Sequence, residues 1–266
     1  MERLIGKTAI VTGAGAGLGS GIARRLAAEG AAVVVADLDQ TAAQAVAADI
    51  QADGGQAAAL VCDVTKADEV DRLVSAAVAR FGKVDLLCNN VGASIEAKQV
   101  LRVTDLTEEQ WDFMLDVNLK SVFLMCRRVI PEMLRCGGGS VVNIASIAGH
   151  KPTFGAAYGA AKAGVIGFTK ALAVQFADDH IRCNAVAPGA MQTPGGGAAA
   201  RQGVFRDQRQ RSRLINDRFG APADIGAAVA FLMSDDAAFI TATTLEVDGG
   251  GLTIVTDIPR RASPEG

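Results

Sequence analysis

The sequence lacks the features that mark disulfide-rich, zinc-stabilised and membrane-spanning proteins. Its five cysteines are odd in number and include no CxxC pair, which argues against a disulfide framework and a structural zinc site. No window approaches the roughly 18 unbroken apolar residues that a membrane-spanning helix requires. The first residues contain no apolar stretch of signal-peptide length. We therefore expect a cytoplasmic protein with no membrane partner.

Excess charge of one sign and aromatic side chains are also scarce. The 26 Lys and Arg residues against 29 Asp and Glu residues leave a formal net charge of -3, without the basic surface that binds nucleic acid. Half of the 266 residues are apolar, so the chain can bury enough surface to fold, which excludes disorder. Because only 5% of the residues are aromatic, we expect the helices to pack closely on small side chains.

Short apolar runs alternate with longer segments of helical period along nearly the whole chain. This alternation is typical of βαβ units, and unbroken β-branched runs are typical of strands covered on both faces. The pattern predicts an α/β fold with one parallel, seven-stranded sheet and helices on both faces. The predicted strands are 7–12, 32–37, 57–62, 84–89, 139–144, 181–187 and 243–247, and the predicted helices are 17–29, 40–52, 66–81, 107–136 in two pieces, 156–177 and 222–233.

The alternation continues without a linker, so we expect a single domain over residues 1–255. Residues 190–217 are too long for a plain connection and are interpreted as a substrate lid. The tail 256–266 is expected to be frayed or to contact another subunit. Arginines in the lid either face an anionic substrate or form a solvated helix face, and the second role is the commoner one. These arginines are Arg201, Arg206, Arg209, Arg211 and Arg213.

The first predicted strand leads directly into a glycine-rich turn, TGAGAGLG at 12–19, and then into a helix. Glycines let the backbone approach a pyrophosphate, whose charge is favoured at a helix N-terminus. Asp37 ends the second strand, where a carboxylate accepts hydrogen bonds from an adenosine ribose and repels a 2′-phosphate. Its alternative role is to cap the following helix or to serve as a turn residue. The context favours a Rossmann-like, doubly wound sheet that binds NAD.

Tyr158 and Lys162 are four residues apart in a helical segment, which places both side chains on one face. A nearby ammonium favours the phenolate and lowers the pKa of a tyrosine from its usual value of about 10. Taken alone, this spacing more often means an aromatic ring that packs on a lysine stem. Ser146, just past the fifth predicted strand, is by itself most simply a loop serine.

Together these motifs resemble the classical short-chain dehydrogenase/reductase family over residues 5–252. The sequence departs from the motifs of this family at two positions, and both changes are conservative. Val91 replaces the alanine of the family motif NNAG, and Asp224 replaces a glutamate. The matching segments, in chain order, are TGAGAGLG (12–19), NNVG (89–92), Asn118, Ser146, Tyr158, Lys162, Pro188 and Gly189 with Thr193, RFGAPADI (218–225) and VDGG (247–250).

The resemblance implies an NAD-dependent oxidoreductase that transfers a hydride between a secondary alcohol or ketone and the nicotinamide, with no metal. Tyr158 would be the acid/base, and Lys162 would hold the nicotinamide ribose and lower the pKa of Tyr158. Ser146 would bind the reacting oxygen, and Asn118 would anchor a water relay. The cofactor-binding residues expected are Gly13, Gly15, Ala16, Gly17, Leu18, Gly19, Asp37, Leu38, Asp63, Val64, Asn90, Gly92, Tyr158, Lys162, Pro188, Gly189, Met191 and Thr193.

The substrate stays open at this point. A cyclic alcohol, a polyol and a hydroxysteroid all fit, whereas a 3-oxoacyl thioester on an acyl carrier protein would favour NADP, which Asp37 opposes. A non-catalytic dinucleotide-binding regulator is opposed by the intact Ser146, Tyr158 and Lys162. His150 either contacts substrate or has no role. The family resemblance predicts a homotetramer, and so do the small and apolar residues on more than one face of the predicted helices 107–136 and 156–177.

Overall fold

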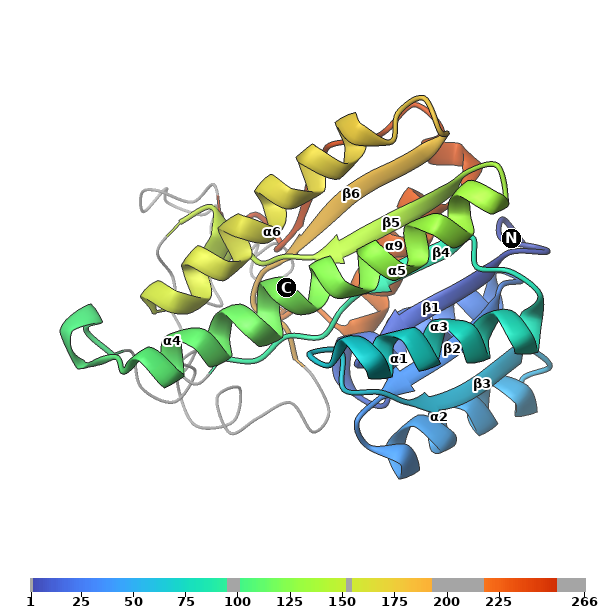
Figure 1. The fold of residues 1–266 in the computed structure, drawn as a ribbon, viewed down its shortest axis with the longest axis horizontal. Coiled ribbons are helices and arrows are strands. Elements are labelled where there is room, and N and C mark those ends of the chain that lie inside the picture. Colours follow the sequence, from blue (N-terminus) through green and yellow to red (C-terminus); the bar gives the residue numbers. More distant parts are fainter. Residues whose placement is uncertain (1, 95–100, 152–154, 193–217, 253–266) are drawn as a thin grey trace, which may run out of the picture.

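The computed structural model describes residues 2–94, 101–151, 155–192 and 218–252. Seven strands form one parallel sheet in the order β3-β2-β1-β4-β5-β6-β7 (Figure 1). The sheet, its direction and the sequence of elements confirm the predicted fold. The strands are β1 (Thr8–Thr12), β2 (Ala32–Asp37), β3 (Gln56–Val61), β4 (Leu86–Asn89), β5 (Gly139–Ile144), β6 (Ile181–Pro188) and β7 (Thr244–Val247).

The strand order reverses between β1 and β4. From β1 the chain adds β2 and β3 on one side, and it then crosses over to add β4 to β7 on the other side. The two crossovers diverge at this point, so the carboxyl ends of β1 and β4 border a crevice in which ligands of open α/β sheets bind. The glycine-rich turn follows β1 and the NNVG segment follows β4, which brings these two motifs together.

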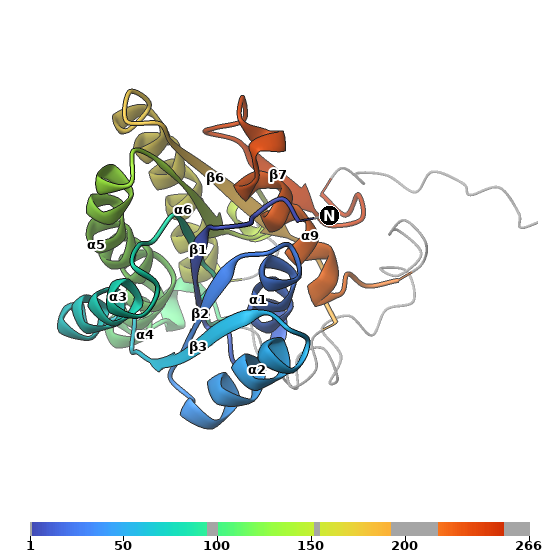
Figure 2. The same cartoon turned by 90° about the vertical axis from the view of Figure 1, so that its right-hand side faces the viewer.

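Helices cover both faces of the sheet and enclose two apolar cores (Figure 2). Successive strand residues alternate between the cores, as Ile10 and Val11 do in β1, because side chains of a strand point to opposite faces. One face carries α1 (Gly17–Ala28), α2 (Gln40–Ala52) and α9 (Pro222–Met233), and the other carries α3 (Ala67–Phe81), α5 (Ser121–Arg135) and α6 (Ala156–Gln175).

Small residues set the distance between α1 and α9. A Cβ on Gly21 would lie 2.5 Å from Pro222 Cβ, and one on Gly226 would lie 2.9 Å from Gly21 O. Neither position has room for a side chain, so the two helices meet backbone to backbone. This contact confirms the close packing expected from the scarcity of aromatic residues.

The segment predicted at 107–136 forms two α-helices joined without a break. A capping box of Thr107 and Gln110 begins α4 (Glu108–Leu115), and a π-helical turn over Asp116–Lys120 leads into α5. The π turn inserts one extra residue per turn, a feature common at functional sites. Asn118, one of the predicted site residues, lies within this turn.

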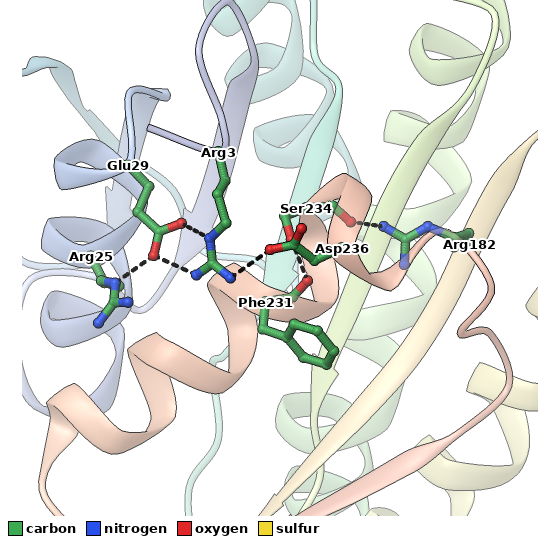
Figure 3. A network of polar contacts seen from close by, with 7 residues as sticks. All are labelled: Arg3, Arg25, Glu29, Arg182, Phe231, Ser234 and Asp236. Atoms are coloured by element: carbon green, nitrogen blue, oxygen red, sulfur yellow. Dashed lines mark hydrogen bonds and ion pairs between the residues drawn. The ribbon is translucent and has the colours of Figure 1, made fainter. Parts of the chain in front are cut away.

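An ion-pair network around the buried carboxylate of Glu29 joins the N-terminal segment to the turn after α9 (Figure 3). Arg3 donates to both oxygens of Glu29 at 2.6 and 2.7 Å, and Arg25 donates to one at 2.6 Å. Arg3 also reaches Asp236 in the turn η6 (Asp235–Ala237). Beside it, Arg182 of β6 donates to backbone carbonyls at the end of α9. Glu29 closes α1, so this network lies at the end of the sheet opposite the crevice.

Some expected features fall outside the described residues. They include Thr193, the five arginines, the tail 256–266 and all of the lid except 190–192. Of the helices that the structure describes, none is long and apolar enough to cross a bilayer. The described side chains include no group of three or more His, Cys, Asp or Glu residues that could hold a metal ion.

Candidate active site

The glycine-rich turn leaves the N-terminus of α1 open toward the crevice. Within this described turn, Ala16 precedes the helix without a side-chain cap, and the first helical turn holds no acidic residue. The first N–H groups and the helix dipole therefore favour an anion. Gly19 permits the tight turn, because a Cβ there would lie 2.1 Å from Gly13 O. This arrangement of donors fits the diphosphate of a dinucleotide.

The turn is held from the neighbouring strand by Asn90. Its Nδ2 donates to Thr12 O at 2.9 Å and to Gly13 O at 3.1 Å, while its backbone N donates to Thr12 Oγ1 at 3.0 Å. Val91 N donates to the same hydroxyl at 3.3 Å. Thr12 was absent from the predicted site residues, although its place at the start of the glycine motif was the available signal. It joins the ends of β1 and β4.

Asp37 lies at the end of β2 with its carboxylate turned to the glycine-rich turn. Its Oδ2 accepts from Gly15 N at 2.8 Å, and its Oδ1 accepts from Asp39 N at 3.0 Å. Asp37 does not cap the following helix, because Asp39 caps α2 by accepting from Ala42 N, but the bond that Asp37 accepts from Asp39 N also makes it a turn residue. Each carboxylate oxygen has two acceptor sites, so both retain capacity for a ribose hydroxyl.

The other adenosine-side residues lie along the same edge of the sheet. Asp63 follows β3, and its Oδ1 accepts from the backbone N and the hydroxyl of Thr65 at 2.9 and 2.6 Å. Val64 is buried, whereas Leu38 is largely exposed beside Asp37. Asp63 thus shapes the turn after β3, a structural task that the sequence did not indicate.

Ser146, Tyr158 and Lys162 come together at the carboxyl end of β5. Ser146 begins the short turn η4 (Ile147–Gly149), and Tyr158 and Lys162 lie on one face of α6. Lys162 Nζ lies 5.7 Å from the centroid of the Tyr158 ring and donates to Ile144 O at 2.9 Å. The side chains of Tyr158 and Ser146 are hydrogen-bonded. The helix spacing and the position of Ser146 after β5 explain why the sequence predicted this cluster.

Burial controls the protonation of the pair. It raises the pKa of the Tyr158 phenol above its ordinary value, while the hydrogen bond with Ser146 acts in the opposite direction. Burial also lowers the pKa of Lys162 to about 8. In the chain by itself, burial therefore keeps the pKa of Tyr158 above its ordinary value, and the lowering expected from Lys162 with bound NAD stays a prediction.

Asn118 lies within the π turn, and its side chain bonds to Ala93, the residue after the NNVG segment. Its Nδ2 donates to Ala93 O at 2.8 Å, and its Oδ1 accepts from Ala93 N at 3.2 Å. A Cβ on Gly92 would lie 3.1 Å from both Asn118 Oδ1 and Lys162 Nζ. Gly92 thus leaves open the space between these two side chains. The water relay from Asn118 to Lys162 stays a prediction.

The segment after β6, which is predicted to contact the nicotinamide, packs against the C-terminal part of the described chain. Gly189 packs on Asp248, where a Cβ would lie 2.5 Å from Asp248 Cβ, and Met191 pairs with Gly220. His150 Nε2 lies 3.4 Å from Glu246 Oε1 of β7. Lys151 Nζ donates to Gly251 O at 2.6 Å and Leu252 O at 3.2 Å, a contact that the sequence did not indicate. The loop after Ser146 is thereby attached to the C-terminal turn.

Comparison with known proteins gives this geometry a family. A family model described as enoyl-(acyl carrier protein) reductase matches residues 13–251. A solved structure from Burkholderia xenovorans, described as a short-chain dehydrogenase/reductase, is similar with a TM-score of 0.89 and 40% identity. The similarity covers 96% of this chain and 100% of that one. The chain belongs to the short-chain dehydrogenase/reductase family.

Two curated relatives of this short-chain dehydrogenase/reductase indicate the range of substrates within the family. A 3β-hydroxysteroid dehydrogenase of Eggerthella lenta is 43% identical, with 94% of this chain and 95% of the relative aligned. A 2,5-dichloro-2,5-cyclohexadiene-1,4-diol dehydrogenase of Sphingobium indicum is 38% identical, with 94% and 97% aligned. This short-chain dehydrogenase/reductase is an oxidoreductase that acts on CH–OH groups, and its family binds a nicotinamide cofactor.

Proposed function

We propose that this short-chain dehydrogenase/reductase uses NAD to interconvert a secondary alcohol and its ketone through Ser146, Tyr158 and Lys162. The observation that carries the proposal is the buried cluster at the end of β5, where the Tyr158 hydroxyl meets Ser146 and Lys162 lies 5.7 Å from the Tyr158 ring. A binding-only protein has no need of a buried ammonium at this position. The cluster borders the same crevice as the glycine-rich turn.

Asp37 supports NAD as the cofactor. Its carboxylate is fixed 2.8 Å from Gly15 N, within the turn that fits the diphosphate, and a 2′-phosphate on the adjoining ribose would meet this negative charge. The neighbouring Leu38 and Ala16 carry no charge that could offset the repulsion. The adenosine ribose of NAD instead offers hydroxyl donors to the carboxylate.

In the oxidative direction Tyr158 takes the proton of the substrate hydroxyl, and Ser146 binds the same oxygen. Lys162 holds the nicotinamide ribose and favours the phenolate, and Asn118 anchors the water that passes the proton onward. Bound NAD supplies the hydride acceptor and, in its oxidised form, a positive charge that lowers the pKa of Tyr158. This charge offsets the burial that raises the pKa in the chain alone.

The relatives favour a cyclic secondary alcohol as the substrate. One is named for a hydroxysteroid and another for a cyclohexadiene diol, and both carry the hydroxyl on a ring. For the assembly we propose a homotetramer, because helices α4 and α5 expose large apolar side chains, namely Trp111, Phe113 and Phe123.

The test is formation of NADH from NAD+ with a panel of cyclic alcohols, hydroxysteroids and polyols, each repeated with NADP+. Reduction of a 3-oxoacyl thioester with NADPH tests the fatty-acid alternative. We expect turnover with a ring alcohol and preference for NAD+. Tyr158→Phe should lower the rate at least about 100-fold while NADH binding stays unchanged, since general acid–base catalysis contributes roughly 10²- to 10⁴-fold. Retention of more than about a tenth of the rate would contradict the role of Tyr158.

A further inference from the structure

A chain of buried polar side chains runs from β4 to the helix that carries Tyr158 and Lys162. Asn89 Nδ2 donates to Asn143 Oδ1 at 2.8 Å, and Asn143 Nδ2 donates to Thr169 Oγ1 at 2.9 Å. The Thr169 hydroxyl in turn donates to Val165 O at 2.7 Å. Each acceptor group is also the next donor, so the hydrogen bonds have one direction from β4 through β5 to α6.

These side chains lie in an otherwise apolar layer. Asn143 and Thr169 are completely buried and Asn89 is nearly so. Residues of the surrounding core include Val165 and Leu172. Buried polar groups cost free energy unless their partners are in place, and of the side-chain oxygens and nitrogens in this series only Asn89 Oδ1 has no hydrogen-bond partner among the described residues. The paired groups of Asn143 and Thr169 favour one packing arrangement over its neighbours. These buried hydrogen bonds are therefore informative about the position in which α6 is held.

The contacts fix α6 on β5 at two points. Thr169 lies seven residues after Lys162, which is close to two helical turns and places both on the face toward the sheet. Lys162 Nζ bonds to Ile144 O, and Thr169 bonds to Asn143, the preceding residue of the same strand. Two contacts two turns apart define both the rotation of α6 about its axis and its position along that axis.

At its β4 end, this series of hydrogen bonds lies next to the residue that holds the glycine-rich turn. Asn89 donates to Asn143 of β5, whereas its neighbour Asn90 donates to Thr12 O and Gly13 O on the glycine-rich turn. The end of β4 thus serves as a common reference for the turn and for the catalytic helix. A shift of α6 would change the distance between the glycine-rich turn and the catalytic helix.

We propose that Asn143 and Thr169 are positioning residues that set the register of α6, and thereby the placement of the Tyr158 hydroxyl and the Lys162 ammonium. The inference rests on the proposed catalytic roles of that pair. Thr169 touches neither cofactor nor substrate in this scheme. A merely structural role would lower stability alone, whereas a positioning role changes the chemistry of Tyr158.

The test compares three variants on α6. Thr169→Val keeps the shape of the side chain and removes its hydroxyl, Thr169→Ser keeps the hydroxyl, and Leu172→Ala weakens the same core without touching the polar chain. For each, kcat, KM and the pH dependence of alcohol oxidation are measured well below the unfolding temperature. Tyr158 is the only tyrosine in the sequence, so protein labelled with [¹³Cζ]tyrosine gives one signal that reports its environment without turnover.

For Thr169→Val we expect kcat to fall about tenfold or more, because small misplacements of reacting groups are costly. The midpoint of the pH profile should shift by about 0.5 unit or more, and the ¹³C signal should move. Thr169→Ser should recover kcat to within about twofold of the unaltered enzyme. Leu172→Ala should lower the unfolding temperature and leave the kcat, the pH midpoint and the signal unchanged.

An unchanged kcat, pH midpoint and ¹³C signal in Thr169→Val would overturn the proposal, as would equal losses in Thr169→Ser. If Thr169→Val does not fold, Thr169→Ala is measured against the same Ser variant and judged by the same criteria. A failure of the proposed function has a different signature. In that case Tyr158→Phe keeps its activity, while the ¹³C signal still reports whether Thr169 sets the environment of Tyr158.

Discussion

At the scale of single residues, the buried ammonium of Lys162 lowers the stability of the folded protein at the proposed catalytic site. The ammonium is completely enclosed, and burial lowers its pKa from 10.5 to about 8. Its described hydrogen bond is to Ile144 O, which is a neutral acceptor. Burial is what lowers its pKa, and no carboxylate among the described residues counteracts it. A charge held in this way is costly to the folded state. Such a cost is expected where a residue is kept for catalysis and not for packing.

Lys162→Met should therefore stabilise the protein at pH 7 by up to about 3 kcal/mol while abolishing turnover. Because the folded pKa is lowered, the unfolded chain binds the proton more tightly and the penalty is complete below about pH 8. The penalty disappears as the pH rises from 8 toward 10.5, so the advantage of the variant should shrink over that range. Urea unfolding at fixed protein concentration from pH 7 to 10 measures this difference.

The matched control for this variant is Lys170→Met on the same helix. Lys170 is exposed, so its replacement should change the free energy of unfolding by less than about 0.5 kcal/mol at every pH. A Lys162→Met protein that is less stable than the unaltered one at pH 7 would show that the ammonium is well accommodated. A gain in stability that does not vary with pH would point to better packing as its cause.

Site residues could be predicted from the sequence where their spacing places them on one face of a helix. Tyr158 and Lys162, which are four residues apart, are an example. Contacts were not predictable where they depend on how separate segments meet. The sequence placed Asp37 beside the glycine-rich turn, but only the fold shows that it bonds Gly15 N at 2.8 Å. Likewise, the raised pKa of Tyr158 follows from burial, which a helix pattern does not reveal.

At the scale of elements, the limits of strands and helices differ from the predicted ones by one or two residues. The agreement has a physical cause, since strands buried on both faces must be unbroken apolar runs. The junction at 116–120 was less accessible. A π turn keeps the helical pattern of side chains, so the sequence predicted two pieces but not how they join. The contact of Arg3 with Asp236 spans 233 positions and has no local signal.

The ion-pair network around Glu29 lies at the end of the sheet opposite the crevice. It leads us to predict how the free energy of unfolding changes at acid pH. Burial by itself raises the pKa of Glu29, but hydrogen bonds from Arg3 and Arg25 outweigh it and hold the pKa below 4.5. A carboxyl with a lowered folded pKa adds stability above its unfolded pKa and loses it as the pH falls through the folded one. Glu29→Gln should cost about 2 kcal/mol at pH 7, since the hydrogen bonds that Arg3 and Arg25 donate would lose their charged acceptor.

The measurement is the unfolding free energy of Glu29→Gln and of the unaltered protein between pH 7 and pH 3. The difference should stay constant down to about pH 5 and narrow below it as Glu29 takes up its proton. Asp49→Asn is the control, because it breaks the exposed pair with Arg24 and should cost less than about 1 kcal/mol. A difference between Glu29→Gln and the unaltered protein that persists unchanged at pH 3 would mean that shape, and not charge, sets the cost.

At the scale of the whole molecule, two general rules restrict the order of the strands in the predicted parallel sheet. Parallel strands need helical crossovers, and crossovers have one hand, which leaves few arrangements for seven alternating units. The crevice at the reversal between β1 and β4 then fixes where the glycine-rich turn and the Ser146 cluster meet. What the sequence left open is the outer surface. A helix pattern shows that several faces are apolar, but the fold decides which of them stay uncovered.

Of the eleven large apolar side chains that are exposed on the described surface, five lie on the helices that were expected to meet other subunits. Trp111 and Phe113 of α4 are 36% and 45% exposed, and Phe123 of α5 is 45% exposed. Phe123 also meets the ring of Phe168 on α6 edge to face, with 6.4 Å between the centroids. A cluster of large apolar groups that spans several helices is typical of a protein interface. Val174 on α6 extends the set with 77% exposure.

We therefore expect sedimentation velocity at micromolar concentration to give about four times the 27.3 kDa of one chain. Phe123→Glu should shift the protein to smaller species, because association would bury a carboxylate in an apolar surface at a cost of several kcal/mol. Ile5→Glu carries the same change at an exposed site on the N-terminal turn and should leave the mass unaltered. A monomeric mass for the unaltered chain would refute the tetramer. A tetramer that survives Phe123→Glu would place the subunit contact on another face, since an ionised side chain at the centre of an interface is rarely tolerated without a partner.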